Sequence, residues 1–214
     1  MFEHLFSIDG PYARIMNWVW DVLILSILWF VCCIPVVTIG ASCTAAYYAT
    51  SKVIRHHTGR IHQEFFSSFK RNIRQSIPLT VLFLLFIFVI VIECLYFYSD
   101  TRFPVAVIYF FYSMLLAVLG CGLYLWACLS RFDRSSFALL RMSVILTFRH
   151  LLTTVSLLSL MILTILGIYL MPWGILVFPG FMYVLSSYLM ERILLKYSPK
   201  VSENDPEGQK WYYQ

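Results

Sequence analysis

The chain has 214 residues, of which 60% are hydrophobic and only 13% are charged, with a net charge of +5. Typical soluble proteins are about 45–50% apolar and about 25% charged, so a soluble domain of this size could not cover so much apolar surface. The composition excludes a soluble globular protein and predicts a single transmembrane domain at residues 1–198, followed by a short polar tail at 199–214.

Four long stretches carry no formal charge and indicate where the chain crosses the membrane. They are residues 22–51, 75–92, 103–130 and 150–190. A helix rises about 1.5 Å per residue and the hydrocarbon core is about 30 Å thick, so about 20 apolar residues make one crossing. The pattern predicts an all-α, polytopic transmembrane bundle with spans at about 15–35, 41–54, 76–98, 104–130, 150–170 and 173–191.

The first stretch leaves the span count open between five and six. Residues 35–40, with the sequence PVVTIG, are expected to turn near its middle. If 41–54 crosses back, there are six spans and the N-terminus is cytoplasmic. If 38–51 lies on the cytoplasmic surface, there are five and the N-terminus is external. A surface helix should carry charges along one face, whereas this segment has none and is rich in Gly, Ala and Ser, so we favour six.

Most of the sixteen Lys and Arg residues fall in three segments, at 52–74, 131–149 and 192–210. By the positive-inside rule these segments are cytoplasmic, the C-terminus lies with them, and the short link at 98–103 is external. The last stretch must then go out and return, and Pro172-Trp173-Gly174 supplies a helix breaker near its middle.

Two of the basic segments are predicted to contain short amphipathic cytoplasmic helices. Their apolar residues recur every three or four positions: Ile61, Phe65, Phe69 and Ile73 in the first, and Phe137, Leu140, Val144 and Phe148 in the second. Such a helix either anchors on anionic lipid or offers a docking surface to a cytoplasmic partner. If a partner docks, the residues expected at the contact are Phe65, Phe66, Phe69, Lys70, Arg71, Arg141 and Phe148.

The sequence contains no P-loop, dinucleotide-binding, zinc-protease or nucleophile-elbow motif. We therefore predict a non-enzymatic protein without catalytic residues, cofactor or metal, which binds neither nucleotides nor nucleic acids. The six cysteines lie in apolar runs without a C-x-x-C pair, which favours small buried hydrophobes over disulfides or zinc ligands. His56, His57, His62 and Glu64 are close in sequence, but a hydrophilic loop is the commoner explanation than a metal site.

Two carboxylates, Asp21 and Glu93, fall within or near the predicted spans. Ionisable groups in the membrane are costly and usually face protein or water. Each either reaches the membrane interface or makes a polar contact inside the bundle, and Arg102 is the nearest cationic candidate for Glu93. An alternative function, a self-contained small transporter or channel, would use Glu93 or Asp21 to line its pathway. A third, an intramembrane enzyme acting on lipid-linked glycans, lacks a visible acid and base pair.

Several motifs in the first three quarters of the chain resemble a known family. LFSIDGP at 5–11, NWVWD at 17–21, CCIPVVTIGAS at 32–42, FFSSFKRN at 65–72 and FRHL at 148–151 are similar to motifs of the YesL-like family of bacterial membrane proteins, found largely in Gram-positive bacteria. The block IPVVTIGAS is the most specific of them.

Members of that family are typically encoded beside carbohydrate ABC importers and glycan-degrading enzymes. The resemblance therefore implies a multi-pass protein of the bacterial cell membrane that acts as an auxiliary subunit of an oligosaccharide ABC importer. It would pack against the permease subunits and also touch the ATPase through its cytoplasmic helices. The E-A-A-x-x-x-G loop of the permeases is absent from the sequence, which argues that the chain is not itself a permease.

Overall fold

The structure is a computed structural model of the chain, and it describes residues 11–56, 58–99, 105–132 and 134–197. These ranges contain helices and no strand, which confirms the predicted all-α class. The α-helices within them are α1 (Pro11–Cys33), α2 (Ile39–Ala49), α3 (Ile61–Ser99), α4 (Val105–Arg131), α5 (Ser136–Arg149), α6 (Leu151–Leu170) and α7 (Phe178–Tyr197). Two 3₁₀ segments, η1 (Val36–Thr38) and η3 (Pro172–Leu176), and one π-helical segment, η2 (Thr50–Arg55), connect or extend them.

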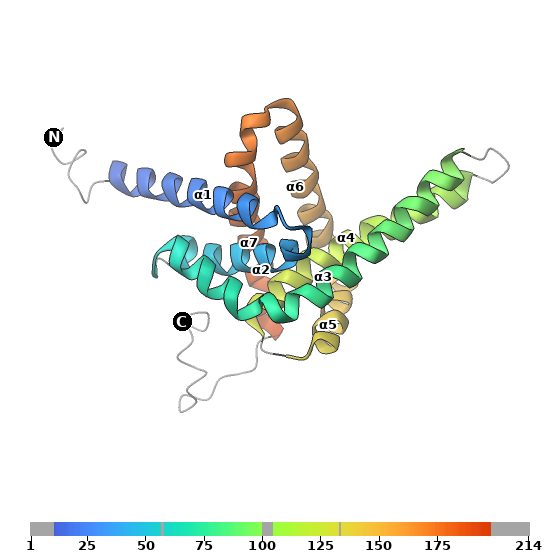
Figure 1. Cartoon of the computed structure of the whole chain (residues 1–214), viewed down its shortest axis with the longest axis horizontal. Helices are drawn as coiled ribbons and strands as arrows, with labels where there is room; N and C mark the ends of the chain where they lie inside the picture. Colours follow the sequence, from blue (N-terminus) through green and yellow to red (C-terminus); the bar gives the residue numbers. More distant parts are fainter. Residues whose placement is uncertain (1–10, 57, 100–104, 133, 198–214) are drawn as a thin grey trace.

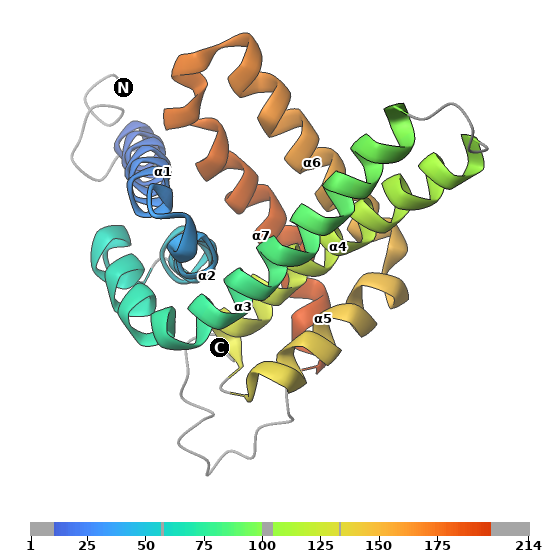
Figure 2. The ribbon, with the colours of Figure 1, turned by 45° about the vertical axis from the view of Figure 1, so that its right-hand side comes forward.

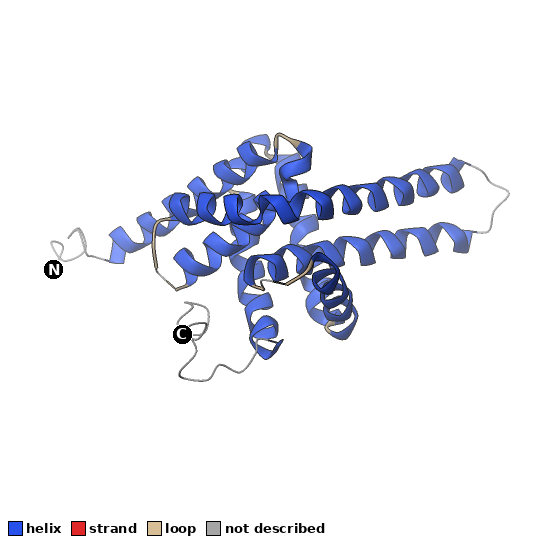
Figure 3. Ribbon diagram, turned by 60° about the horizontal axis from the view of Figure 1, so that its bottom comes forward, coloured by secondary structure: helices blue, strands red, loops and turns tan. Residues whose placement is uncertain are grey.

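The helices fan out from a common centre instead of running parallel (Figure 1). α3 and α4 lie side by side as one long hairpin, α6 and α7 form a second hairpin, and the two hairpins diverge toward their tips (Figure 2). α1 extends in the opposite direction from the α3–α4 hairpin (Figure 3). α2 lies near the centre and packs against α1, α3, α4 and α7, whereas α5 lies against α4.

The chain turns between α1 and α2 at the position that the sequence predicts. α1 ends at Cys33, and Pro35, which has no backbone N–H to continue a helix, precedes η1. The Thr38 hydroxyl lies 2.7 Å from the carbonyl oxygens of both Cys32 and Pro35. The Thr38 N–H also donates to the Pro35 carbonyl at 2.9 Å. This one threonine therefore ties the end of α1 to the start of α2.

Small residues allow α2 to occupy the middle of the molecule. Its fully buried positions include Ala41, Ser42, Ala45, Ala46 and Ala49. A Cβ atom on Gly40 would collide with the Trp126 indole of α4 and the Thr80 hydroxyl of α3, so only glycine permits this approach. The predicted role of the segment in close helix packing is confirmed, and α2 does not lie on the surface.

Four helical segments are long and apolar enough to cross a membrane: Met16–Cys33, Ile61–Phe97, Ala106–Arg131 and Leu151–Leu170. They correspond to the predicted first, third, fourth and fifth spans and indicate a multi-pass membrane protein. α2 and α7, which correspond to the predicted second and sixth spans, do not meet the same criterion of length and composition. α6 ends at Leu170 and η3 begins at Pro172, so the breaker predicted at 172–174 is confirmed.

The segment predicted to be the first cytoplasmic connection differs from its prediction in helix structure. Instead of a separate amphipathic helix followed by a span, the chain forms one helix of 39 residues, α3, with Pro78 inside it. At about 1.5 Å per residue this helix is about 58 Å long, nearly twice the thickness of the hydrocarbon core. Figure 1 shows it bent between its teal first part and its green second part. An internal proline removes a backbone donor and commonly produces such a bend.

The apolar stripe at the start of α3 faces the protein and not a lipid interface. Ile61 is 2% exposed and Phe65 is 0% exposed. Phe69 is half-buried and stacks on Phe65, with the ring centroids 6.2 Å apart. α3 packs against α2 and η2, which supply the apolar surface that the stripe covers. The structure thus corrects the predicted interfacial position of this stripe.

Candidate functional site

The described parts of the basic segments lie at one end of the helices. The Lys52 ammonium pairs with a Glu64 carboxylate oxygen at 2.7 Å and thereby joins η2 to the start of α3. The Gln75 amide donates to the Arg134 carbonyl at 2.7 Å and joins α3 to the connection before α5. The Gln75–Arg134 contact therefore joins the end of the first basic segment to the second.

Two arginines connect the first two basic segments to the last turns of α7, just before the third basic segment begins. The Arg55 guanidinium of η2 donates to the Ser187 carbonyl of α7 at 3.0 Å and lies 5.4 Å from the centroid of the Tyr188 ring. At the end of α4, Arg131 pairs with Glu191 of α7 at 2.6 Å. The first two segments that were predicted to be cytoplasmic and the end of α7, where the third one begins, are therefore on the same end of the described structure.

The Arg131–Glu191 pair is almost completely removed from solvent. Its side chains are 4% and 3% exposed. The Tyr47 hydroxyl of α2 donates to the other Glu191 oxygen at 3.4 Å. Burying a charge is costly unless an opposite charge and hydrogen bonds compensate it, so this pair fixes the relative positions of α2, α4 and α7. The sequence did not single out either partner of this ion pair.

Among the predicted contact residues on α3, three present a surface to a partner. Phe65 is fully buried and offers no surface, which corrects its assignment, and Phe69 is half-buried. Phe66 is 44% exposed, and Lys70 and Arg71 are exposed beside it. An exposed aromatic ring next to two cations suits an acidic, partly apolar partner surface.

α5 presents the larger part of the predicted contact surface. Its inner face, which includes the fully buried Leu139 and Leu146, faces the core. Phe137 is 79% exposed and Phe148 is 60% exposed, with the exposed Arg141 between them. We define the α5 outer face as the exposed side chains Phe137, Arg141, Val144, Ile145 and Phe148. Their spacing of three, four and seven residues puts them on one side of the helix.

The two predicted intramembrane carboxylates lie on different helices and do not form a common site. Asp21 is half-buried in α1, within electrostatic range of His62 at the start of α3. Glu93 is half-buried in the last turns of α3. Arg102, the expected cationic neighbour of Glu93, lies outside the described residues.

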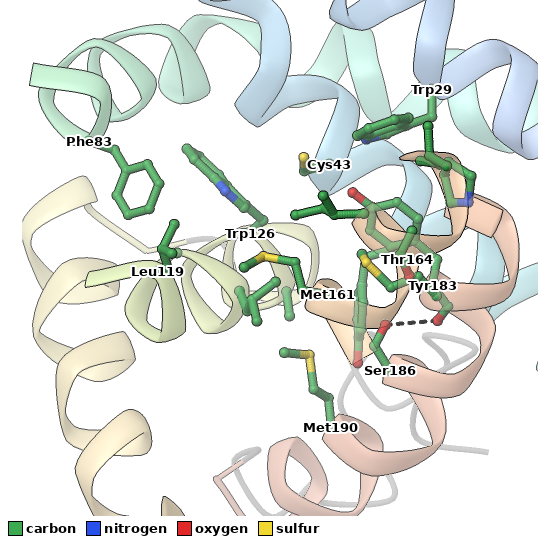
Figure 4. A pocket seen from close by; sticks show the side chains of 18 residues that line it. Trp29, Cys43, Phe83, Leu119, Trp126, Met161, Thr164, Tyr183, Ser186 and Met190 are labelled. Atoms are coloured by element: carbon green, nitrogen blue, oxygen red, sulfur yellow. Dashed lines mark hydrogen bonds between the residues drawn. The ribbon is translucent and has the colours of Figure 1, made fainter. Parts of the chain in front are cut away.

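An apolar cavity of about 300 Å³ lies where the two hairpins diverge (Figure 4). α3 and α4 supply one wall and α6 and α7 the other, while α1 and α2 contribute Trp29, Cys43 and Tyr47. No charged side chain lines it, and neither Asp21 nor Glu93 takes part. The cavity was not predictable from the sequence, because its lining comes one or a few residues at a time from six helices.

Of the four residues considered for a metal site, His57 lies outside the described residues. No group of three His, Cys, Asp or Glu side chains within the described ranges is placed to hold a metal ion. Glu64 is instead paired with Lys52. The six cysteines are free thiols within helices; Cys94 and Cys128 are buried and the others are half-buried.

The first three helices carry the similarity to known proteins. Residues 22–94 match the family described as "Protein of unknown function, DUF624". The matched region begins in α1, contains the α1–α2 turn and all of α2, and ends in α3, so it includes the block IPVVTIGAS on which the YesL-like resemblance depends. No curated protein and no solved structure gave a match. The α5 outer face and the Arg131–Glu191 pair lie beyond the matched region.

Proposed function

We propose that this chain is a non-enzymatic auxiliary membrane subunit of a bacterial carbohydrate ABC importer and packs against the permease subunits. The observation that carries the proposal is the α5 outer face, on which two phenylalanines at 79% and 60% exposure flank an arginine. A contiguous exposed apolar patch on a folded protein is typical of an interaction site. The importer as the partner is inferred from the family resemblance.

The topology that we propose has six spans in the cell membrane, with both termini in the cytoplasm. Its support is that the first two basic segments and the end of α7, where the third begins, meet at one end, as the positive-inside rule expects of cytoplasmic segments. Asp21 of α1 lies within electrostatic range of His62 of α3, which supports a position of the first half of α1 toward the same end. In this topology α2 with η2 forms the short second span, surrounded by other helices.

The cytoplasmic end then offers two neighbouring docking surfaces. One is the α5 outer face, and the other is formed by Phe66, Lys70 and Arg71 on α3. Gln75 connects the two elements, so a single partner could contact both. We assign these surfaces to the importer, with the ATPase as the candidate partner at the cytoplasmic end and the permease subunits along the spans.

A self-contained transporter is less consistent with the cavity. A path for ions or sugars needs polar side chains or water within the membrane. The cavity between the hairpins is lined by uncharged residues, and the carboxylates of Asp21 and Glu93 are not among them. The geometry therefore favours an accessory role over the alternative.

Paired surface variants test the proposal. The tagged protein is extracted in digitonin, isolated, and its partners are identified by mass spectrometry. We expect wild type to bring down permease subunits, and Phe137→Asp with Phe148→Asp to lose most of them. Phe66→Asp with Lys70→Glu tests the second surface in the same way.

Each variant must retain the wild-type melting temperature for the comparison to count. Isolation of the wild-type chain alone from intact membranes would contradict the proposal. An unchanged complex in both paired variants would contradict the docking surfaces.

A further inference from the structure

We propose that the cavity between the two hairpins is a binding site for an acyl chain of a membrane lipid. This inference does not depend on the proposed importer or on the α5 outer face. It depends on the position, lining and size of the cavity.

The cavity opens toward the part of the protein that lipid surrounds. Its two sides include α4 and α6, which both contain segments long and apolar enough to cross a membrane. Ile165 of α6 lines the cavity and is also 59% exposed at the surface, so the cavity reaches the outside of these helices. In a bilayer the medium at that surface is hydrocarbon, and acyl chains are its most concentrated component.

The lining matches a hydrocarbon chain in its chemistry. Trp126 of α4 and Tyr183 of α7 present large apolar surfaces on opposite sides (Figure 4). Met161, Met182 and Met190 complete the wall. Methionine is unbranched and polarizable, so it adjusts to an occupant of irregular or changing shape. A flexible acyl chain is such an occupant.

The size of the cavity also indicates an occupant. An apolar cavity of about 150 Å³ stays free of water and binds benzene. The present cavity is about 300 Å³ and is lined by uncharged residues. At roughly 30 Å³ per heavy atom, the share of a water molecule in the liquid, it holds about ten chain atoms. An empty space of this volume would forgo the dispersion contacts that a chain makes with the walls.

Photo-crosslinking in a defined bilayer tests the assignment. The purified full chain is reconstituted into phosphatidylcholine vesicles that contain a trace of phosphatidylcholine with a diazirine near the end of one acyl chain. After illumination, labelled peptides are mapped by mass spectrometry. We expect labels at Trp126 and Met182 in addition to those on exposed positions such as Leu163.

A filled cavity and a matched surface change sharpen the test. Thr164→Phe places a ring at the cavity wall, and we expect labelling at Met182 to fall several-fold. Leu163→Phe makes a similar change at a residue that is 64% exposed, and we expect wild-type labelling at Met182.

Two results would overturn the proposal. One is labelling of the wild-type protein at Leu163 but not at Trp126 or Met182. This result does not depend on the folding of any variant. The other comes from a photoreactive amino acid introduced at position 182: a crosslink in native membranes to another protein and none to lipid would make the cavity a protein interface.

Discussion

Arg131→Met should strongly destabilise the fold, because it leaves the Glu191 carboxylate buried without its charged partner. In the wild type the two side chains are 2.6 Å apart and only 4% and 3% exposed. Within the described residues, the Glu191 carboxylate would keep only the Tyr47 hydroxyl, at 3.4 Å. Removing one member of a buried pair costs about 3–5 kcal/mol. For a chain of this size, 1 kcal/mol shifts the melting temperature by about 2–4 °C, so we expect a decrease of roughly 6–20 °C.

The assay is thermal unfolding of the detergent-solubilised protein, followed by far-ultraviolet circular dichroism and by size-exclusion chromatography after heating. The double variant Arg131→Met with Glu191→Leu removes both charges, so it should recover most of the loss. Glu64→Gln is the control, since it breaks the Lys52–Glu64 pair, whose side chains are 21% and 19% exposed. A partly exposed pair of this kind contributes about 1 kcal/mol or less.

Two results would refute the reasoning about the buried pair. One is a melting temperature of Arg131→Met equal to that of Glu64→Gln. The other is a double variant less stable than Arg131→Met alone, because the cost would then not arise from an uncompensated charge.

Three further predictions follow from burial and topology. Phe65→Ala should lower the free energy of unfolding by about 3–5 kcal/mol, because the ring is 0% exposed. Phe66→Ala should change it by about 0.5 kcal/mol, because that ring is 44% exposed. Equal effects of the two variants in thermal unfolding would contradict the buried position of the stripe. Gly180→Ala should lower the free energy of unfolding by about 1–3 kcal/mol in the same assay, because the added methyl group would lie 2.6 Å from the Val22 carbonyl oxygen. A variant as stable as the wild type would show that α1 and α7 are further apart. In intact cells with the native cysteines replaced, a cysteine at Trp173 should react with an impermeant maleimide, and a cysteine at Arg60 should react only after lysis. The reverse pattern of labelling would contradict the proposed orientation of the chain in the membrane.

Four of the predicted spans and the predicted helix ends, which depend on local sequence, agree with the structure. The charge-free runs indicated helices of membrane-spanning length, since few soluble helices tolerate 20 apolar residues in succession. Pro35 and Pro172 marked the ends of helices because proline supplies no backbone donor. The small residues of 40–49 indicated close packing, and α2 is buried accordingly.

Properties that depend on which surfaces meet were not predictable in the same way. The stripe through Phe65 has the same periodicity whether it faces lipid or protein, because hydrocarbon and apolar side chains do not differ in hydrophobicity. The structure shows that it faces α2 and η2. The cavity was not predictable either, because it exists only where the two hairpins diverge.

The Arg131–Glu191 pair did leave a signal in the sequence. Arg131 is the first charge after the run at 103–130, and Glu191 is the first after the run at 150–190. Both runs end on the side predicted to be cytoplasmic. The first charged residues beyond them are therefore expected at the same depth relative to the membrane. An acidic and a basic residue at equivalent ends of two spans would have been a reasonable candidate pair.

Site-specific crosslinking at Phe148 in living cells tests the accessory role most directly. A photoreactive benzoylphenylalanine replaces Phe148 on the α5 outer face. As a control, benzoylphenylalanine replaces Leu163, which is 64% exposed on α6, and reports the contacts that any lipid-facing position makes. The proposed function predicts that Phe148 gives a discrete protein adduct containing a subunit of a carbohydrate ABC importer. Adducts to lipid alone at Phe148, with the importer intact in the same membranes, would contradict it.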